Sequence, residues 1–171
     1  MKTKIYITGA SGFIGFHVAK KFLDKGFVVH GFDSMNNYYD IKLKKSRLSI
    51  LKKYKKFSFT KGLLENQKLL NQSVTKFKPS IIIHLAAQAG VRYSIDNPDI
   101  YLNANIIGTF NVINISNMVR VKHLMIGSSS SVYGANKKIP FQEIDKTDHQ
   151  VSFYAATKKS TESLAHSYSS L

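Results

Sequence analysis

A glycine-rich segment near the N-terminus restricts the fold more than any other feature of the chain. It lies between Lys4–Thr8, an apolar run of strand length, and Phe13–Lys25, where apolar side chains recur at helical spacing. The segment contains Gly9, Gly12 and Gly15. Glycines here let the backbone turn tightly, approach a pyrophosphate and seat the helix against the strand. The pattern predicts a strand–turn–helix unit whose helix N-terminus binds phosphate, although a plain tight turn would give the same triplet.

The rest of the chain repeats this alternation of strand-length and helical segments. Strands separated by helices favour right-handed crossovers and a parallel sheet covered by helices on both faces. At 171 residues, the chain is long enough for one domain, which we expect to span residues 1–171. Further strands are expected at 28–33, 57–61, 81–85 and 123–127, and helices near 40–53, 65–77, 98–118 and 153–168.

The charge balance is strongly basic, with 25 Lys and Arg against 10 Asp and Glu. Such an excess of positive charge can favour binding to nucleic acid, to an anionic membrane or to phosphorylated small molecules. Arginine supplies most bidentate base readout, and the chain has only Arg47, Arg92 and Arg120. Much of the lysine lies in residues 42–61, where interleaved apolar residues predict a helix with one buried face: Leu43, Leu48, Ile50 and Leu51. We therefore expect a lysine-rich surface and no nucleic-acid or membrane partner.

Several classes of protein are disfavoured by what the sequence lacks. Without cysteine, the chain has neither a disulfide framework nor a thiolate metal site, and we predict no metal. No apolar run approaches the roughly 20 residues that a bilayer span needs. The apolar residues before Gly9 are too few for a secretory signal. The expectation is a soluble, cytoplasmic protein.

Asp33 ends the second expected strand, about 20 residues beyond the glycine segment. An acid at this place can hydrogen-bond the adenosine ribose hydroxyls of a dinucleotide, although a strand-end Asp also commonly caps a turn. Because a carboxylate would repel a 2′-phosphate and no Arg follows it, the sequence favours NAD over NADP.

A Ser, Tyr and Lys combination follows the fifth expected strand. Tyr154 and Lys158 fall one turn apart on one face of the last expected helix. A phenol is a poor base at neutral pH, and a nearby ammonium favours its phenolate form. A serine from residues 127–134 can hydrogen-bond the same substrate oxygen. The Tyr–Lys pair alone is also found in ordinary amphipathic helices, but its order after the glycine segment favours catalysis.

These motifs resemble the extended short-chain dehydrogenase/reductase superfamily of NAD-dependent nucleotide-sugar epimerases and dehydratases. Within it, the sequence is most similar to the bacterial UDP-glucuronate 4-epimerases. The resemblance covers essentially the whole chain and implies a Rossmann-type doubly wound α/β fold. It rests on residues 8–19 (TGASGFIGFHVA), 33–48 (DSMNNYYDIKLKKSRL), 84–98 (HLAAQAGVRYSIDNP), 127–134 (GSSSSVYG) and 154–162 (YAATKKSTE).

The resemblance also implies a role for individual residues. Tyr154 matches the catalytic base, Lys158 its activator and a ligand of the NAD ribose, and Ser129 the hydrogen-bonding hydroxyl. Arg92, Ser129 and Ser130 are expected to contact the substrate, with Arg92 placed for its anionic part. NAD is expected to contact the residues of the glycine segment and those that follow the strands: Gly9, Ser11, Gly12, Phe13, Ile14, Gly15, Asp33, Leu64, Ala86, Ala87, Gln88, Asn105, Tyr154 and Lys158.

The implied activity is C4 epimerisation of UDP-glucuronate for polysaccharide biosynthesis, with a homodimer as the expected assembly. The sugar is transiently oxidised at C4 to a 4-keto sugar and re-reduced on its other face. Related dehydratases and decarboxylases carry acids just after the catalytic hydroxyl residue. Ser130 and Ser131 stand there in this chain, which favours an epimerase.

Two features depart from the family pattern. Leu63 stands where the family usually has an Asp that hydrogen-bonds adenine. The loss of this hydrogen bond predicts that cofactor binding is weaker by about 1 kcal/mol. Family members are about twice as long, so the fold is expected to stop before the substrate domain. We therefore expect weak or no turnover from this chain. The alternative is a non-catalytic fragment that binds dinucleotide or pairs with another chain.

Overall fold

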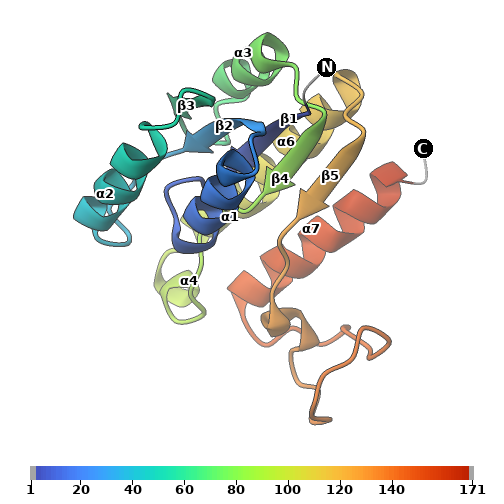
Figure 1. The fold of residues 1–171 in the computed structure, drawn as a ribbon. Helices are drawn as coiled ribbons and strands as arrows, with labels where there is room; N and C mark the ends of the chain where they lie inside the picture. The colour runs from blue at the N-terminus through green and yellow to red at the C-terminus, as the bar shows by residue number, and fades with distance from the viewer. Residues whose placement is uncertain (1–2, 170–171) are drawn as a thin grey trace. The chain divides into compact units, whose positions relative to one another are not determined.

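A computed structural model describes residues 3–169 and shows a five-stranded sheet in the order β3-β2-β1-β4-β5 (Figure 1). All neighbouring strands are parallel. The strands are β1 (Lys4–Thr8), β2 (Val28–Asp33), β3 (Phe57–Lys61), β4 (Ile81–His84) and β5 (His123–Ile126). This is the strand order of a doubly wound Rossmann sheet, as the sequence predicted.

The chain divides into two compact units. The first comprises Met1–Ala86 with Asn111–Gly127, and the second comprises Ala87–Phe110 with Ser128–Leu171. The whole sheet belongs to the first unit. A single domain over residues 1–171 therefore stays a prediction.

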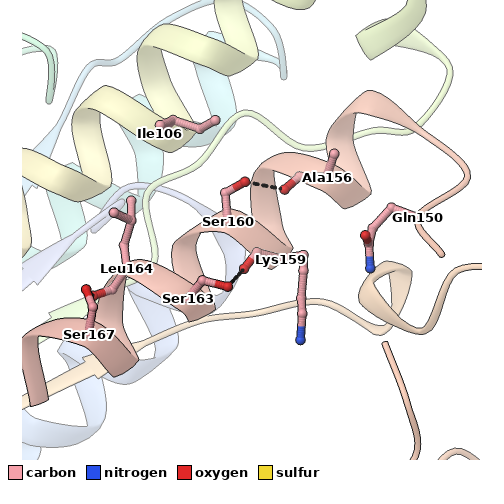
Figure 2. A pocket seen from close by; sticks show the side chains of 8 residues that line it. All are labelled: Ile106, Gln150, Ala156, Lys159, Ser160, Ser163, Leu164 and Ser167. Atoms are coloured by element: carbon pink, nitrogen blue, oxygen red, sulfur yellow. Dashed lines mark hydrogen bonds between the residues drawn. The ribbon is translucent and has the colours of Figure 1, made fainter. Parts of the chain in front are cut away.

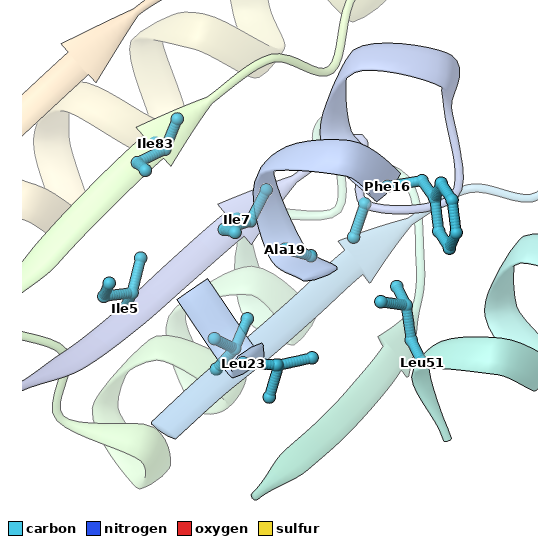
Figure 3. Close-up of a cluster of buried hydrophobic side chains, with 9 residues drawn as sticks. Ile5, Ile7, Phe16, Ala19, Leu23, Leu51 and Ile83 are labelled. Carbon is cyan, nitrogen blue, oxygen red and sulfur yellow. The ribbon is translucent and has the colours of Figure 1, made fainter. Parts of the chain in front are cut away.

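Alternation along β1 builds two cores in the first unit. Ile5 and Ile7 point to one face of the sheet, where they pack with Phe16, Ala19 and Leu23 of α1 (Phe13–Asp24) (Figure 3). Because β-strand side chains alternate between faces, Tyr6 between them points to the other face. It packs there against α3 (Gln67–Phe77) and α6 (Gly108–Met118) in a second cluster: Phe32, Leu64, Leu70, Val74, Ile82, Val112 and Ile115.

The lysine-rich helix α2 (Ile41–Leu51) differs from its prediction. Its buried residues are Lys44 and Leu51, whereas Leu43 is 53% exposed and Ile50 also faces solvent. Lys44 donates to the carbonyl and the side-chain oxygen of Asn36, at 3.0 and 2.6 Å, which satisfies its buried ammonium. The prediction that these apolar residues form one buried face was wrong, because only Leu51 among them is buried and the hydrogen-bonded Lys44 is buried instead.

The second unit contains α4 (Tyr93–Asp96), α5 (Pro98–Tyr101), η1 (Leu102–Ile107), η2 (Ser130–Tyr133) and α7 (Phe153–Ser169). The expected single helix over 98–118 is interrupted, because η1 is a π-helix between α5 and α6. The short elements α4 and η2 were not predicted. Strands β4 and β5 each end one residue earlier than expected, at His84 and Ile126. Among residues 3–169, no helix is long and apolar enough to cross a membrane.

Candidate functional site

The turn between β1 and α1 requires glycine at two of its three positions. Gly9 has φ of +70°, and a Cβ there would lie 2.8 Å from the Ala86 nitrogen. A Cβ on Gly15 would lie 2.1 Å from the Gly9 carbonyl oxygen. The backbone of the helix therefore packs directly against the backbone of the turn, with no room for a side chain between them. Gly12 is less restricted, since its Cβ would meet that oxygen at 3.1 Å. The turn therefore holds the start of α1 in one fixed position.

Ser11 gives this turn an unpartnered polar atom. The residue is fully buried, and its Oγ has no hydrogen-bond partner among the described residues. Gly12 precedes α1 without a side-chain cap, and the first turn of α1 carries no acid. A helix N-terminus with open N–H groups attracts an anion, and a buried hydroxyl requires a partner. These features fit the pyrophosphate of a dinucleotide.

Asp33 joins this turn to the end of β2. Its two carboxylate oxygens accept hydrogen bonds from the Ser11 and Met35 backbone N–H groups, at 2.9 and 2.8 Å, and it is buried. The acid therefore fixes the phosphate-binding turn from within the protein. Each oxygen keeps a second lone pair, so hydrogen bonding to a ribose hydroxyl stays a prediction.

Thr8 contributes to the site, although the sequence reasoning gave it no role. Its Oγ1 accepts the N–H groups of Leu85 and Ala86, both at 3.1 Å, and lies 2.7 Å from His84 Nδ1. Because the hydroxyl accepts twice, its own hydrogen is donated to the His84 nitrogen. Thr8 thus holds the segment after β4 beside Gly9. Its position directly before the first glycine was the only available signal.

The residues after β3 differ in their exposure. Leu64 lies in the core of the first unit, and its carbonyl accepts a hydrogen bond from Asn111 Nδ2 at 3.0 Å. Leu63, in the place of the family's acid, is 51% exposed. The Leu64 side chain thus packs in the core, and its expected cofactor contact stays a prediction.

In the second unit, α7 carries Tyr154 and Lys158 one turn apart, as predicted. Lys158 is 5% exposed, and burial lowers the pKa of its ammonium below the ordinary value. The Glu162 carboxylate partly opposes this by raising that pKa. The Tyr154 ring packs edge to face against Tyr101, with 6.0 Å between ring centroids. A buried lysine one helical turn after a partly exposed phenol is suited to proton transfer.

Ser129 stands at the start of η2, which contacts α7. Its Oγ accepts the Ser131 N–H at 3.2 Å, so its hydrogen is available to a ligand. Ser130 is exposed. Ser128 donates to Glu162 on α7 at 2.6 Å, a link that the sequence did not reveal.

Gln88 and Asn105 form a reciprocal pair in the second unit. The Gln88 N–H donates to Asn105 Oδ1 at 2.7 Å, and Asn105 Nδ2 donates to the Gln88 carbonyl and to Thr157 Oγ1, both at 3.0 Å. Both amide hydrogens of Asn105 are therefore donated to other residues of the chain. The buried Gln88 Nε2 has no partner within the described part of the chain, and its contact with the cofactor stays a prediction.

The remaining expected ligands are all exposed: Phe13, Ile14, Ala87 and Arg92. No group of His, Cys, Asp or Glu in residues 3–169 could hold a metal ion. A shallow groove along α7 contains none of the expected site residues (Figure 2). It is lined by Ile106, Gln150, Ala156, Lys159, Ser160, Ser163, Leu164 and Ser167.

The strand order, the glycine turn and the Tyr–Lys helix define the class of Rossmann-fold proteins of short-chain dehydrogenase/reductase type. Within that class, residues 6–171 match the model of the family described as GDP-mannose 4,6 dehydratase, and the chain belongs to this family of nucleotide-sugar epimerases and dehydratases.

Curated relatives support the epimerase branch. The chain is 50% identical over 165 residues to a probable UDP-glucuronate 4-epimerase of Rhizobium meliloti, covering 96% of this chain and 48% of the relative. It is 43% identical to UDP-glucuronate 4-epimerase 1 of Arabidopsis thaliana, covering 96% of this chain and 38% of the relative. The chain thus spans at most about half the length of these two relatives.

Solved structures agree in fold. A UDP-glucuronic acid 4-epimerase mutant from Bacillus cereus, in complex with UDP-4-deoxy-4-fluoro-glucuronic acid and NAD, superposes with a TM-score of 0.85 at 29% identity. The match covers 98% of this chain and 52% of that one. The Thermotoga maritima UDP-glucose 4-epimerase with UDP-glucose gives a TM-score of 0.86 at 28% identity over the same shares.

Proposed function

We propose that the chain is the NAD-binding and catalytic part of a nucleotide-sugar 4-epimerase acting on UDP-glucuronate, and that residues 1–171 serve as its NAD-binding domain. The observation that carries the proposal is the buried Lys158 one turn after Tyr154, in a chain half identical to a probable UDP-glucuronate 4-epimerase. We place this activity in cytoplasmic polysaccharide biosynthesis, because a uronic acid nucleotide is an activated sugar donor.

The residues present fit NAD. In the first unit, the turn from Gly9 to Gly15 with the Ser11 hydroxyl would hold the pyrophosphate, and Asp33 would hold the adenosine ribose. In the second unit, Lys158 and Gln88 Nε2, which has no partner among the described residues, would bind the nicotinamide part. When bound, NAD would accept hydride from C4 of the sugar and return it to the opposite face.

The proton chemistry is assigned to α7 and η2. Tyr154, as phenolate, takes the proton of the sugar 4-hydroxyl while hydride leaves C4, and it returns that proton after hydride comes back. The Lys158 ammonium stabilises the phenolate, and the Ser129 hydroxyl donates to the same sugar oxygen. Ser130 and the exposed Arg92 would bind the sugar, with Arg92 paired to the uronate carboxylate. The two residues directly after Ser129 are Ser130 and Ser131, so these positions supply no second acid or base for elimination.

Binding and turnover test the proposal separately. The chain has no Trp, so NADH binding can be followed by the cofactor's own emission without interference. We expect NADH to bind more tightly than NADPH, because Asp33 would repel a 2′-phosphate. Conversion of UDP-glucuronate to its C4 epimer is then assayed with the chain, a Tyr154→Phe variant and a Tyr168→Phe control on the same helix. Loss of a measurable turnover in Tyr154→Phe alone supports the proposal, and equal measurable turnover in all three contradicts it. Because we expect at most weak turnover from this chain, the absence of turnover in all three supports the fragment described next.

The alternative function is a dinucleotide-binding or chain-pairing fragment. The observation that favours this alternative is that the chain matches only about half the length of its relatives. Calorimetry with UDP-glucuronate separates the two. NADH binding without any sugar-nucleotide binding supports the fragment.

We also propose a homodimer. Within the described sheet, β5 pairs only with β4, and Met125 on β5 is 50% exposed. An unpaired, uncharged edge strand favours association with a second copy.

A further inference from the structure

The first turn of α7 is capped by two serines, of which one is distant in sequence. The first N–H groups of a helix have no partner within it. Ser152, just before the helix, accepts the Ala155 N–H with its Oγ at 3.1 Å. The Tyr154 N–H donates instead to Ser94 Oγ of α4, at 3.2 Å. Ser94 therefore caps the helix residue that carries the proposed base.

The Ser94 hydroxyl makes a second bond that a simple cap would not need. While its oxygen accepts from Tyr154, its hydrogen is donated to the Val91 carbonyl at 2.6 Å. The Ser94 and Ile95 N–H groups close the turn onto Val91 and Arg92, at 3.2 and 3.0 Å. Ser94 is 1% exposed, so water does not compete for these bonds. One hydroxyl thus links the start of α7 to the loop that presents Arg92.

Tyr101 provides an independent link between the same two parts. It is fully buried, and its hydroxyl lies 2.8 Å from the Ala89 carbonyl and 2.7 Å from the Gly90 carbonyl. Its ring meets the Tyr154 ring edge to face, at an interplanar angle of 72°. Gly90 has φ of +103°, which marks the point where the loop turns under the Tyr101 hydroxyl. Tyr101 therefore binds the loop with its polar end and packs on Tyr154 with its ring.

We propose that Ser94 and Tyr101 are positioning residues that hold the Ala89–Arg92 loop and the first turn of α7 as one rigid piece. The functional meaning rests on the proposed function, in which Arg92 binds the uronate and Tyr154 moves the proton. Reacting groups must be held to within about 0.5 Å, and an exposed loop does not hold such a position by itself. Two buried tethers supply that rigidity. Substrate held at Arg92 is thereby fixed relative to the Tyr154 phenol.

Amide hydrogen exchange of the full chain tests the tether without cofactor or sugar. In Ser94→Ala, we expect exchange at the Tyr154 and Ile95 amides to rise about fivefold, the effect of losing one cap. The matched control is Ser152→Ala, which removes the adjacent cap. It should accelerate exchange at Ala155 and leave Ile95 unchanged. If amide exchange at Ile95 is unchanged in Ser94→Ala, or rises equally in both variants, the proposed positioning role of Ser94 is wrong.

Tyr101→Phe tests the second link, because it removes the hydroxyl and keeps the ring against Tyr154. Faster exchange at Ile95 with Ala155 unchanged supports the proposal, and no change at Ile95 contradicts it. A last measurement adds UDP-glucuronate with NADH. The two added ligands should slow amide exchange at Tyr154 in the unaltered chain and not in Ser94→Ala. If the sugar nucleotide has no effect on the unaltered chain, the proposed function fails while the exchange results still decide the tether.

Discussion

Acid should destabilise the first unit through His30, a histidine of β2 held inside a polar cluster. Its Nδ1 lies 2.7 Å from Ser58 Oγ, and its Nε2 lies 3.0 Å from Thr60 Oγ1 and 3.1 Å from Ser73 Oγ. The imidazole stacks on Tyr6, with 4.9 Å between ring centroids, and is 8% exposed. Burial lowers the pKa of His30 from 6.5 to about 4. The Lys4 ammonium, which lies over the neighbouring Phe77 ring, adds positive charge nearby.

The sign and size of the effect follow from that pKa. Because the folded state prefers neutral imidazole, its contribution to the free energy of unfolding is present above pH 6.5. It is lost as the pH falls from 6.5 to about 4. The full loss is about 3 kcal/mol, and about 2 kcal/mol of it falls between pH 7 and pH 5.

The perturbation is His30→Gln, which removes the titrating group and keeps a side chain that can hydrogen-bond. Urea unfolding of the first unit, followed through the amide signals of β1 and β2, gives the free energy of unfolding at pH 7 and pH 5. The unaltered chain should lose about 2 kcal/mol more than the variant. Replacing the exposed His17 with Gln is the control and should behave as the unaltered chain. Equal losses in the chain and in His30→Gln would refute the reasoning.

Two further predictions concern the glycine turn and the sheet edge. Gly15→Ala would place a Cβ 2.1 Å from the Gly9 oxygen, so we expect a loss of about 1–3 kcal/mol in stability and of NADH binding. Gly12→Ala, where that distance is 3.1 Å, should lose less in the same NADH titration, and an equal loss would contradict the steric argument. Met125→Lys should shift the chain towards monomer in sedimentation by charging the β5 strand. Met118→Lys, at an exposed position of α6, is its control, and a dimer that persists in Met125→Lys excludes the β5 edge as the dimer interface.

The sequence alone determined the fold class, because the order of strands and helices depends on local pattern, and for the same reason it supplied the residues of the proposed chemistry. Strand-length apolar runs alternating with helical periods predict a parallel sheet, and the five strands were found at the expected places. The glycines of the first turn could be predicted because their backbone requirements are local, as the Cβ distances at Gly9 and Gly15 show. The Tyr154–Lys158 spacing likewise needs only helical geometry.

Tertiary structure decided which side chains serve the protein and which remain open to a ligand. Both amide hydrogens of Asn105 bond Gln88 and Thr157, whereas Gln88 Nε2 has no partner among residues 3–169. Ser94 and Tyr101 gave no signal, and Thr8 gave only its place before Gly9, since their partners lie outside the local patterns that the sequence displays. A periodic pattern records which face of an element is buried. It does not record which distant donor meets which acceptor, because that pairing exists only once the chain has folded.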